Sequence, residues 1–513
     1  MVFAYENPND LKTAFTKMRI FPTKIIAALF TLTAGSTVFS MVETYPDAHQ
    51  GVLASDRYEV TIHQDGKTYP AFVYMSKAPD DDFAGSRFHI GRTIAWSSFS
   101  FTGTVWVEIK GKGIQTIKAE DSLIYPSRFN LKAEETGENS IKFRLARAGQ
   151  YVFRPGEDGF EHGLVIIADP PETSKPDIES PNTLVCDSID RNWLDANIEG
   201  KSVLYFKNGI HDLQGEYVFP EHVKEIYLEG GSVVYGAFHF NHDNVKVYGR
   251  GTISGARMEF REDHQIESPA DTSGIIVEGI MVADFNKFAI RLLGSHNAIR
   301  WCKTLGAWRY NHDGLVAWAH STMEHCFIHA DDDAIKIYDD NVAVNDCVIW
   351  HMQNGACLQL GWESLAAKNV SVRNIDIVRA EWLDEGMQSN VGVVNLRLPT
   401  GRGNSSENFL FENIYVDTPI LKFLDLRMKR EEKDDGGRHK IKNYIFRNIH
   451  VKMKELDTQN NYNFIIPWNE EWGFENVVFE DFYINGKKIT EENKESDGRF
   501  RIDPLARDDI SFR

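Results

Sequence analysis

A short unit recurs through the second part of this chain: an asparagine, a short apolar strand, a polar residue and a second strand. The closest copies are about 20 to 30 residues apart, and helical periodicity is nearly absent. One β-rich unit repeated at that period predicts a solenoid of the parallel β-helix type, in which coils stack at about 4.8 Å. A propeller is the alternative, but its blades would be longer and four-stranded. The copies are NVKVYGRGTISG from Asn244, NAIRWCKTLGAW from Asn297, NVAVNDCVIWHM from Asn341, NVSVRNIDIVRAEW from Asn369, NFLFENIYVDTP from Asn408, NYIFRNIHVKMKE from Asn443 and NVVFEDFYING from Asn476.

The first part of the chain has a different pattern. From about Tyr45 to Ile167, short segments of alternating polar and apolar residues are broken by Gly, Asp and Pro, which predicts an antiparallel β-sandwich. The proline-rich stretch ADPPETSKPDIESPN then lacks any periodicity and is interpreted as a linker. The predicted fold is therefore all-β: an N-terminal extension with a signal peptide (1–41), a β-sandwich domain (42–175) and a parallel β-helix domain (176–513).

The N-terminus has the layout of a secretory signal peptide. It begins at Met18 with Arg19 and Lys24, continues through an apolar run over 25–32 and ends in small residues. This layout predicts a secreted or periplasmic protein, with a buried N-terminal helix as the alternative. The apolar run is too short to span a bilayer well, so membrane insertion is not expected. The net charge of −19 argues against nucleic acid or an anionic membrane as a partner.

The cysteines indicate how the coils are aligned. Five cysteines in a chain of 513 residues do not make a disulfide framework. Cys302, Cys326 and Cys347 recur at similar intervals, and if each occupies one position per coil they form an inward-facing stack. In that register, the segment NHDGLVAW (311–318) lies one coil before DDDAIKIY (331–338).

The same register brings three carboxylates together. Asp313 falls beside Asp333, with Asp332 next to it. Like charges held close raise one pKa, so that one carboxyl keeps a proton while its partner stays ionised, as glycoside hydrolysis requires. The alternatives are a Ca²⁺ site and aspartates that bind local backbone amides at turns, as we expect for Asp331. We expect no metal and no cofactor.

Aromatic residues surround this patch. The faces of Trp and Tyr pack against the C–H groups of sugars, although aromatic residues in a core are the alternative. Lys336 could bond a sugar hydroxyl or pair with Asp333, and Gln359 lies in the next coil toward the same cleft. The predicted substrate-binding residues are Trp318, Lys336, Tyr338, Trp350, Gln359 and Trp362, with Trp308 nearby.

The runs NHDGLVAW and HADDDAIKIYDDNVAVNDCVIW, followed by LQLGW, resemble glycoside hydrolase family 49, the dextranases and isopullulanases. The resemblance implies an N-terminal β-sandwich followed by a right-handed parallel β-helix. It also implies that Asp332 is the general acid and that Asp313 and Asp333 hold or activate the attacking water, with inversion at the anomeric carbon. The chain departs from the family's pattern at three positions of the expected cleft: Ala334, Asp339 and Gln359.

The resemblance makes a secreted α-glucan hydrolase the expected function, with internal cleavage of dextran (α-1,6-glucan) as the first choice and pullulan as the second. The run over 426–443 is rich in Lys and Arg and leaves a marine galactan open, because an anion-binding subsite at Lys429 and Arg430 would suit a sulfated polymer. A solvated loop of mixed charge is the alternative. Two other classes share the predicted fold: polysaccharide lyases, which typically need Ca²⁺ and an Arg or Lys base, and non-catalytic carbohydrate-binding β-helices.

Overall fold

Both predicted architectures are present in the computed structural model, which is all-β. It describes residues 40–513 except 46–52, 157–158, 362–366, 384–389, 397–405, 429–439, 456–457 and 459. The predicted signal peptide, Trp362 and the basic residues Lys429 and Arg430 lie outside the described residues. Within the described part of the chain, no helix is both long and apolar enough to cross a membrane.

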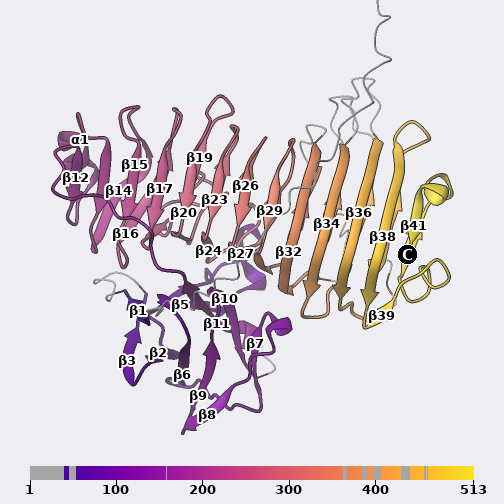
Figure 1. Ribbon diagram of the computed structural model, residues 1–513, viewed down its shortest axis with the longest axis horizontal. Helices are drawn as coiled ribbons and strands as arrows, with labels where there is room; N and C mark the ends of the chain where they lie inside the picture. The colour runs from indigo at the N-terminus through magenta and orange to yellow at the C-terminus, as the bar shows by residue number, and fades with distance from the viewer. Residues whose placement is uncertain are drawn as a thin grey trace, which may run out of the picture. The chain divides into compact units, whose positions relative to one another are not determined.

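Two sheets of short strands form the N-terminal β-sandwich (Figure 1). Burial alternates along strands such as β2, because one face of each sheet packs on the other. One pair departs from the antiparallel prediction: β5 and β11 run parallel, with His162 opposite Thr93. The first sheet has the order β1 (Met41–Thr44), β5 (Thr93–Thr102), β11 (His162–Asp169), β10 (Gly149–Pro155) and β7 (Ser122–Tyr125), with β4 (Val73–Lys77) beside β5; the second has β3 (Lys67–Ala71), β2 (Tyr58–Gln64), β6 (Val105–Gly111), β9 (Ser140–Leu145) and β8 (Glu134–Gly137).

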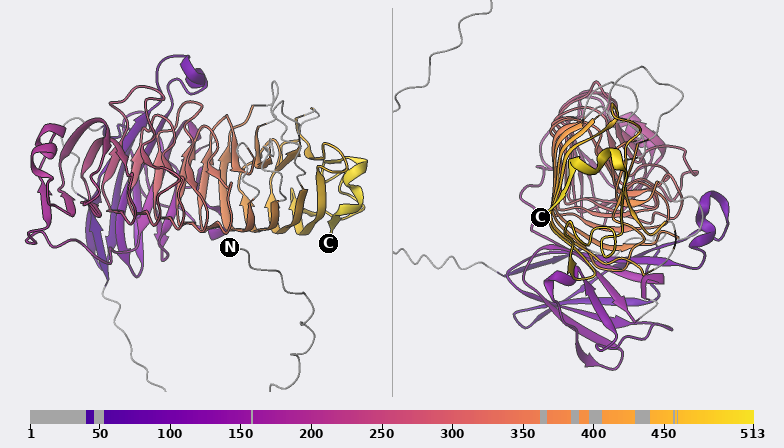
Figure 2. Two further views of the ribbon diagram at one scale, coloured as in Figure 1. Left: turned by 90° about the horizontal axis from the view of Figure 1, so that it is seen from above. Right: turned by 90° about the vertical axis from the view of Figure 1, so that its right-hand side faces the viewer.

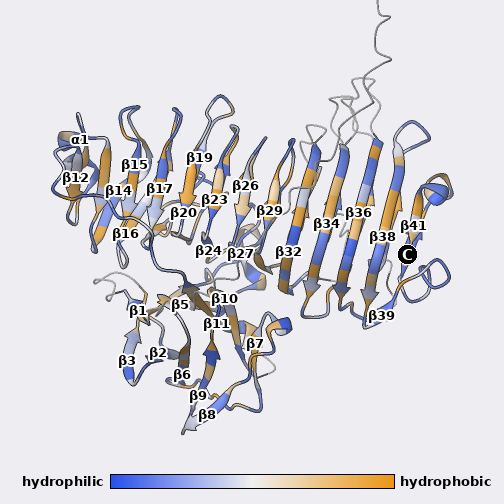
Figure 3. Ribbon diagram, viewed as in Figure 1, coloured by the Kyte–Doolittle hydropathy of each residue, from blue (hydrophilic) through white to orange (hydrophobic). Residues whose placement is uncertain are grey.

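The chain then winds into a solenoid of parallel strands from β12 (Thr183–Cys186) to β41 (Ile510–Phe512), with helix α1 (Arg191–Asn197) at its first coils (Figure 1). Figure 2 shows the coils one behind another and the sandwich along one side. Apolar and polar residues alternate along the longest strands, β32 (Lys368–Ala380), β34 (Ser406–Val416), β36 (Lys440–Val451) and β38 (Gly473–Ile484) (Figure 3). The shorter strands around the site are β22 (Ile290–Leu292), β24 (Lys303–Leu305), β25 (Leu315–Ala317), β27 (Phe327–Ala330), β28 (Ile335–Lys336), β30 (Val348–His351) and β31 (Ala356–Gln359).

The predicted register between coils is confirmed. Cys302, Cys326 and Cys347 are completely buried, and the residue after each cysteine pairs with its counterpart in the next coil. All three belong to the continuous apolar core inside the coils. Burial raises the pKa of the Cys302 and Cys326 thiols well above the ordinary value, so these cysteines act as apolar packing groups.

The asparagines that begin the repeats stack into a ladder. The last five of them, and also Asn244, adopt left-handed backbone, with φ between 53° and 63°, a conformation that asparagine tolerates better than most side chains. From Asn369 onward, each Nδ2 donates to the Oδ1 of the asparagine one coil earlier at 2.8–3.3 Å. Asparagine therefore recurs because it combines the turn conformation with a hydrogen bond between coils. The ladder consists of Asn341, Asn369, Asn408, Asn443 and Asn476.

Replacing Asn408 separates these two contributions. Asn408→Val should lower the free energy of unfolding by about 2–4 kcal/mol, because it removes two ladder hydrogen bonds and places a β-branched residue at φ 63°. Asn408→Gly makes no ladder bond but accepts the backbone conformation, so it should lose about half as much. Urea unfolding followed by circular dichroism measures both losses. Equal losses would contradict the contribution of the backbone conformation.

The sandwich packs along the side of the solenoid through an apolar patch and buried ion pairs. The patch joins Phe160 of the sandwich to Trp308 and Trp350 of the coils. Lys303 in β24 and Asp169 in β11 form an ion pair in which both side chains are almost fully buried. Because removing one partner of a buried pair costs about 3–5 kcal/mol, these charges penalise any other docking position.

Candidate active site

Three aspartates meet at the turns that lead into two neighbouring strands of the solenoid. Asp313 precedes β25, while Asp332 and Asp333 lie between β27 and β28. The backbone N–H of Gly314 donates to the carbonyl of Asp333 at 3.0 Å, so Asp313 stacks beside Asp333 as the register predicted. One carboxylate oxygen of each aspartate lies within 4.8 Å of the other two.

Asp332 is the most exposed of the three aspartates, at 9%. Its Oδ2 accepts hydrogen bonds from the backbone N–H of Asn311 (2.8 Å) and from Nδ2 of Asn354 (2.7 Å), and its Oδ1 accepts one from the N–H of Asp333 (3.0 Å). Burial raises the pKa of Asp332 to about 7, and the charge of Asp333 adds to the rise. A carboxyl group with this pKa can carry a proton at neutral pH and also release it.

Lys336 bridges the other two aspartates. Its Nζ lies 2.8 Å from Oδ2 of Asp313 and 2.6 Å from Oδ2 of Asp333. Although burial opposes the charge, the carboxylates of Asp333 and Asp313 hold the pKa of Lys336 well above its usual value. Oδ1 of Asp333 also accepts from the backbone N–H of Ala356 at 3.0 Å. Oδ1 of Asp313, in contrast, has no hydrogen-bond partner among the described residues.

Charge balance keeps a proton in this cluster. If every group were ionised, three carboxylates would face one ammonium, and two uncompensated negative charges would remain in a buried site. Burial raises the pKa of Asp313 well above its ordinary range, against the attraction of Lys336. The site therefore holds protonated and ionised carboxyl groups side by side, which is the requirement for acid–base catalysis.

The aspartates lie in the wall of an open cavity of about 520 Å³. Along the outward side of β22, β25 and β28, Arg291, Val316 and Lys336 form one row across three coils. The cavity combines charged groups with aromatic rings, one of which, Tyr310, is 40% exposed. Its lining residues are Arg261, Phe288, Arg291, Leu293, Tyr310, Asn311, Asp313, Val316, Trp318, Asp332, Asp333, Lys336, Tyr338, Asn354 and Asn390.

Of the predicted substrate-binding residues, Trp318, Lys336 and Tyr338 line the cavity. The expectation for Trp350 is wrong. Its side chain is 1% exposed, packs against Phe160 of the sandwich and donates its Nε1–H to Glu381 at 3.2 Å. Alternation along β30 points Trp350 toward the face that the sandwich covers, and the sequence does not reveal which outer face is covered.

Gln359 also differs from expectation. It follows Lys336 in the row across the coils, but it is completely buried and its Nε2 donates to Asp333 (3.4 Å) and Asn395 (3.2 Å). It therefore supports Asp333 from beneath and does not line the cavity.

Asp331 accepts the backbone N–H of Gln353 at 2.8 Å, as we expected of a turn residue.

The three departures from the family's pattern were expected in the cleft, and this expectation is wrong. The side chain of Ala334 is completely buried in the core inside the coils. Asp339 accepts the backbone N–H of Asp340 at 2.8 Å and is not among the lining residues, and Gln359 lies beneath Asp333.

Seven polar or aromatic lining residues were not predicted, besides the aliphatic Leu293 and Val316. Asn354 stands one coil after Asp332, so the same register extended by one coil would have found it. Arg291 pairs with Val316 one coil later, so the same register could have predicted it as well. The others lie in turns and connecting segments, where the repeat carries no signal. The seven are Arg261, Phe288, Arg291, Tyr310, Asn311, Asn354 and Asn390.

The aspartate cluster does not fit a Ca²⁺ ion as it stands. The ammonium of Lys336 occupies the position between Asp313 and Asp333 that a cation would need, and a metal would have to displace it. A second group of possible ligands surrounds His239, whose Nδ1 is 3.1 Å from Glu216 and whose Nε2 is 3.4 Å from Asp263. Although burial disfavours the charge, the hydrogen bond and charge of Asp263 raise the pKa of His239, which favours an ion-paired imidazolium.

Comparison with known proteins agrees with the resemblance to glycoside hydrolase family 49 that the sequence showed. Residues 27–153 match the family model described as the glycosyl hydrolase family 49 N-terminal Ig-like domain. The chain is 26% identical over 421 residues to a dextranase of Arthrobacter globiformis, covering 66% of this chain and 65% of that protein. It is 24% identical over 409 residues to an isopullulanase of Aspergillus niger, covering 71% of each. Its structure is similar to Dex49A from Penicillium minioluteum, with a TM-score of 0.78, 18% identity and coverage of 92% of this chain and 96% of that one.

The fold and the site together assign this protein to a class. It is a parallel β-helix protein with an N-terminal β-sandwich and a candidate acid–base site of aspartates in a cavity on the coils. By these matches the chain is similar to proteins of glycoside hydrolase family 49, and the family model covers its N-terminal part. It spans 65% of the length of the Arthrobacter globiformis dextranase that it matches.

The burial of Asp332 predicts how stability depends on pH. With a pKa of about 7 in the folded protein against an ordinary 3.8, Asp332 holds a proton between these values that the unfolded chain releases, so its contribution to stability falls as the pH rises. Asp332→Asn removes this dependence. We expect the melting temperature of the variant, relative to wild type, to rise by about 2 °C or more between about pH 4.5 and about pH 8 in calorimetry.

Asp339→Asn is the matched control, because Asp339 belongs to the same run of sequence but does not line the cavity. It should show no such increase. A difference between Asp332→Asn and wild type that is constant over this pH range would contradict the buried, raised-pKa carboxyl.

Proposed function

We propose that the protein is a glycoside hydrolase that cleaves α-glycosidic bonds in an α-glucan, with internal cleavage of dextran as the first choice and pullulan as the second. The observation that carries the proposal is the cluster of three aspartates around Lys336 in the wall of an open, aromatic-lined cavity. The similarity to dextranases and to an isopullulanase supports the substrate class.

Asp332 is the proposed general acid. It is the aspartate most accessible from the cavity, and its pKa of about 7 allows it to be protonated when the sugar binds. In the reaction it donates its proton to the glycosidic oxygen as the bond to the leaving sugar breaks. Because this role requires the protonated form, kcat should fall as the pH rises through the pKa of Asp332.

Asp313 and Asp333 are the proposed partners of the attacking water. Their spacing alone would favour a retaining reaction, since most inverting glycosidases separate the two carboxyl groups by about 6.5–9.5 Å. A retaining nucleophile must reach the anomeric carbon, yet each of these aspartates is 1% exposed and has one oxygen bound to Lys336. A water molecule can approach where the carboxylates cannot. Oδ1 of Asp313 can accept a hydrogen bond from this water, because it has no hydrogen-bond partner among the described residues. We therefore propose attack by water, with inversion.

The site disfavours a polysaccharide lyase. A lyase of this fold would need a neutral Lys or an Arg as its base, whereas two carboxylates hold Lys336 in its protonated form. A non-catalytic carbohydrate-binding solenoid would have no need of three buried aspartates, which cost stability.

We also propose export of the protein, on the signal-peptide pattern that begins at Met18. The hypothesis of a sulfated galactan as substrate depends on Lys429 and Arg430, which lie outside the described residues.

The first test is a panel of purified polysaccharides. We expect reducing ends and shortened chains from dextran or pullulan, without the ultraviolet-absorbing unsaturated products of a lyase and without inhibition by a chelator. Asp332→Asn should lower kcat by a factor of about 10³ or more while polymer binding persists, because the proton donor is lost. Asp339→Asn should retain activity. Near-normal kcat in Asp332→Asn would exclude it as the acid.

The stereochemistry of the product tests the roles of Asp313 and Asp333. Proton NMR during the first minutes of hydrolysis should show the β-anomer of the new reducing end, formed by water attack opposite an α-linked leaving group. Initial appearance of the α-anomer would show retention. In that case one of the two aspartates must move to reach the anomeric carbon.

A further inference from the structure

A turn of the sandwich reaches the segments that hold Asp332. The 3-10 turn η1 (Phe83–Phe88) lies against the solenoid, where the carbonyl of Ala84 accepts the backbone N–H of Tyr310 at 3.2 Å. The next residue, Asn311, donates its backbone N–H to Asp332. One of the two chain segments that hydrogen-bond Oδ2 of Asp332 is therefore in direct contact with the sandwich.

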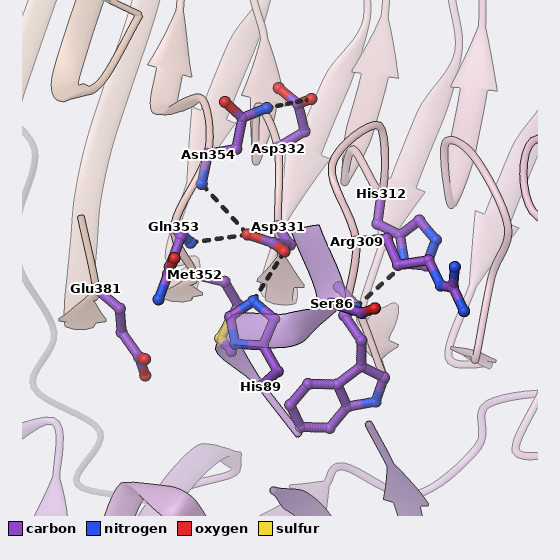
Figure 4. Close-up of polar contacts among 12 residues, drawn as sticks. Ser86, His89, Arg309, His312, Asp331, Asp332, Met352, Gln353, Asn354 and Glu381 are labelled. Atoms are coloured by element: carbon purple, nitrogen blue, oxygen red, sulfur yellow. Dashed lines mark hydrogen bonds and ion pairs between the residues drawn. The ribbon is translucent and has the colours of Figure 1, made fainter. Parts of the chain in front are cut away.

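His89, directly after this turn, reaches the other segment. The imidazole is completely buried, and its Nε2 lies 3.0 Å from Oδ2 of Asp331 (Figure 4). Oδ1 of Asp331 accepts the backbone N–H groups of Gln353 (2.8 Å) and Asn354 (3.2 Å). Nδ2 of Asn354 donates to Asp332 at 2.7 Å. A chain of three hydrogen bonds thus runs from the sandwich to the proposed acid.

Arg92 determines which nitrogen of His89 carries the proton. Nη1 of Arg92 lies 3.3 Å from Nδ1 of His89, and a guanidinium only donates, so Nδ1 accepts and Nε2–H donates to Asp331. Glu381 holds Arg92 with contacts of 2.6 and 2.9 Å, and both of these side chains are almost fully buried. The imidazole is therefore oriented by groups that do not line the cavity.

We propose that His89 is a positioning residue for the reaction: through Asp331 it holds Asn354 against Asp332, so that the sandwich completes the active site. A turn aspartate needs only local N–H donors, whereas Asp331 also binds a buried donor that lies 242 residues away in the sequence. The inference rests on the proposed role of Asp332 as the acid. It makes the sandwich part of the catalytic machinery and more than a cap on the solenoid.

The test compares three substitutions of His89 in the full chain, with the polymer that the panel selects, dextran in the first instance. Gln can place an amide N–H near the position of Nε2, Asn is too short to reach Asp331, and Leu has no donor. We expect His89→Leu and His89→Asn to lower kcat about tenfold with KM within about twofold, because the acid is misplaced while the cavity is intact. His89→Gln should recover most of the activity.

The pH profile separates positioning from general loss of structure. The hydrogen bond from Asn354 favours the ionised form of Asp332, so its loss should move the alkaline limb of kcat to higher pH by about half a unit or more. The charged groups that face Asp332 and His89 are unchanged in these variants, so the shift reports the hydrogen bond. These groups are Asp313, Asp333, Lys336, Asp331, Arg92 and Glu381; burial lowers the pKa of the neighbouring His312 and His329, so these imidazoles are neutral.

Gln150→Leu is the matched control. Gln150 makes another buried contact between the domains, from its Nε2 to the carbonyl of His325 at 2.9 Å, but it does not line the cavity. This variant should lose stability without a change in kcat or in the alkaline limb.

Unchanged kcat and an unchanged alkaline limb in the folded His89→Leu and His89→Asn variants would overturn the inference, as would equal losses in the three His89 variants and in Gln150→Leu. If His89→Leu does not fold, the comparison of His89→Asn with His89→Gln decides. An inactive Asp332→Asn together with His89 variants like wild type would overturn only this inference. Activity in Asp332→Asn would overturn the proposed acid itself.

Discussion

The backbone register between successive coils is the constraint on which the rest of this structure depends. Because side chains alternate along a strand, a slip of one residue would bring Lys336 into the apolar core and turn core residues outward. The cysteine stack inside the coils and the asparagine ladder at their turns resist such a slip. The site depends on the same register: Gly314 lies so close to the carbonyl oxygen of Ala334 that a Cβ at this position would stand 2.3 Å from it. This close approach sets Asp313 beside Asp333.

The sandwich adds a second constraint, which acts across the coils. Its interface with the solenoid contains the buried pairs of Lys303 with Asp169 and of Arg92 with Glu381. Buried pairs of this kind add little net stability, because the loss of hydration offsets most of the attraction. Their effect is on orientation, since a shifted sandwich would leave one of these charges buried without its partner. The contact of His89 with Asp331 belongs to the same interface, so correct docking and correct placement of the loops around Asp332 are one event.

The repeat was sufficient to predict the solenoid, and the cysteine spacing was sufficient to predict that Asp313, Asp332 and Asp333 meet. Both depend on the regular period of the coils, which a sequence displays directly. The misplacement of Trp350 has a different origin, because period-two alternation shows that a residue faces outward but does not show which outer face another domain covers. His89 was beyond reach for a related reason. It contacts Asp331 across 242 residues, and nothing local in either segment indicates the other.

The positions where this chain departs from the pattern of the family it resembles bear on what it binds. Ala334, Asp339 and Gln359 all lie off the cavity wall: the first in the core, the second at a turn and the third beneath Asp333. None of them lines the cavity, so they give no reason to change the α-glucan substrate proposed above. Other lining residues, such as Arg261 and Tyr310, come from irregular segments and do face the cavity. These segments lie outside the coil strands, so the repeat does not dictate which side chains stand there. If the proposed function holds, discrimination between one glucan and another is expected to reside in these segments, while the proposed acid–base chemistry resides in the coils.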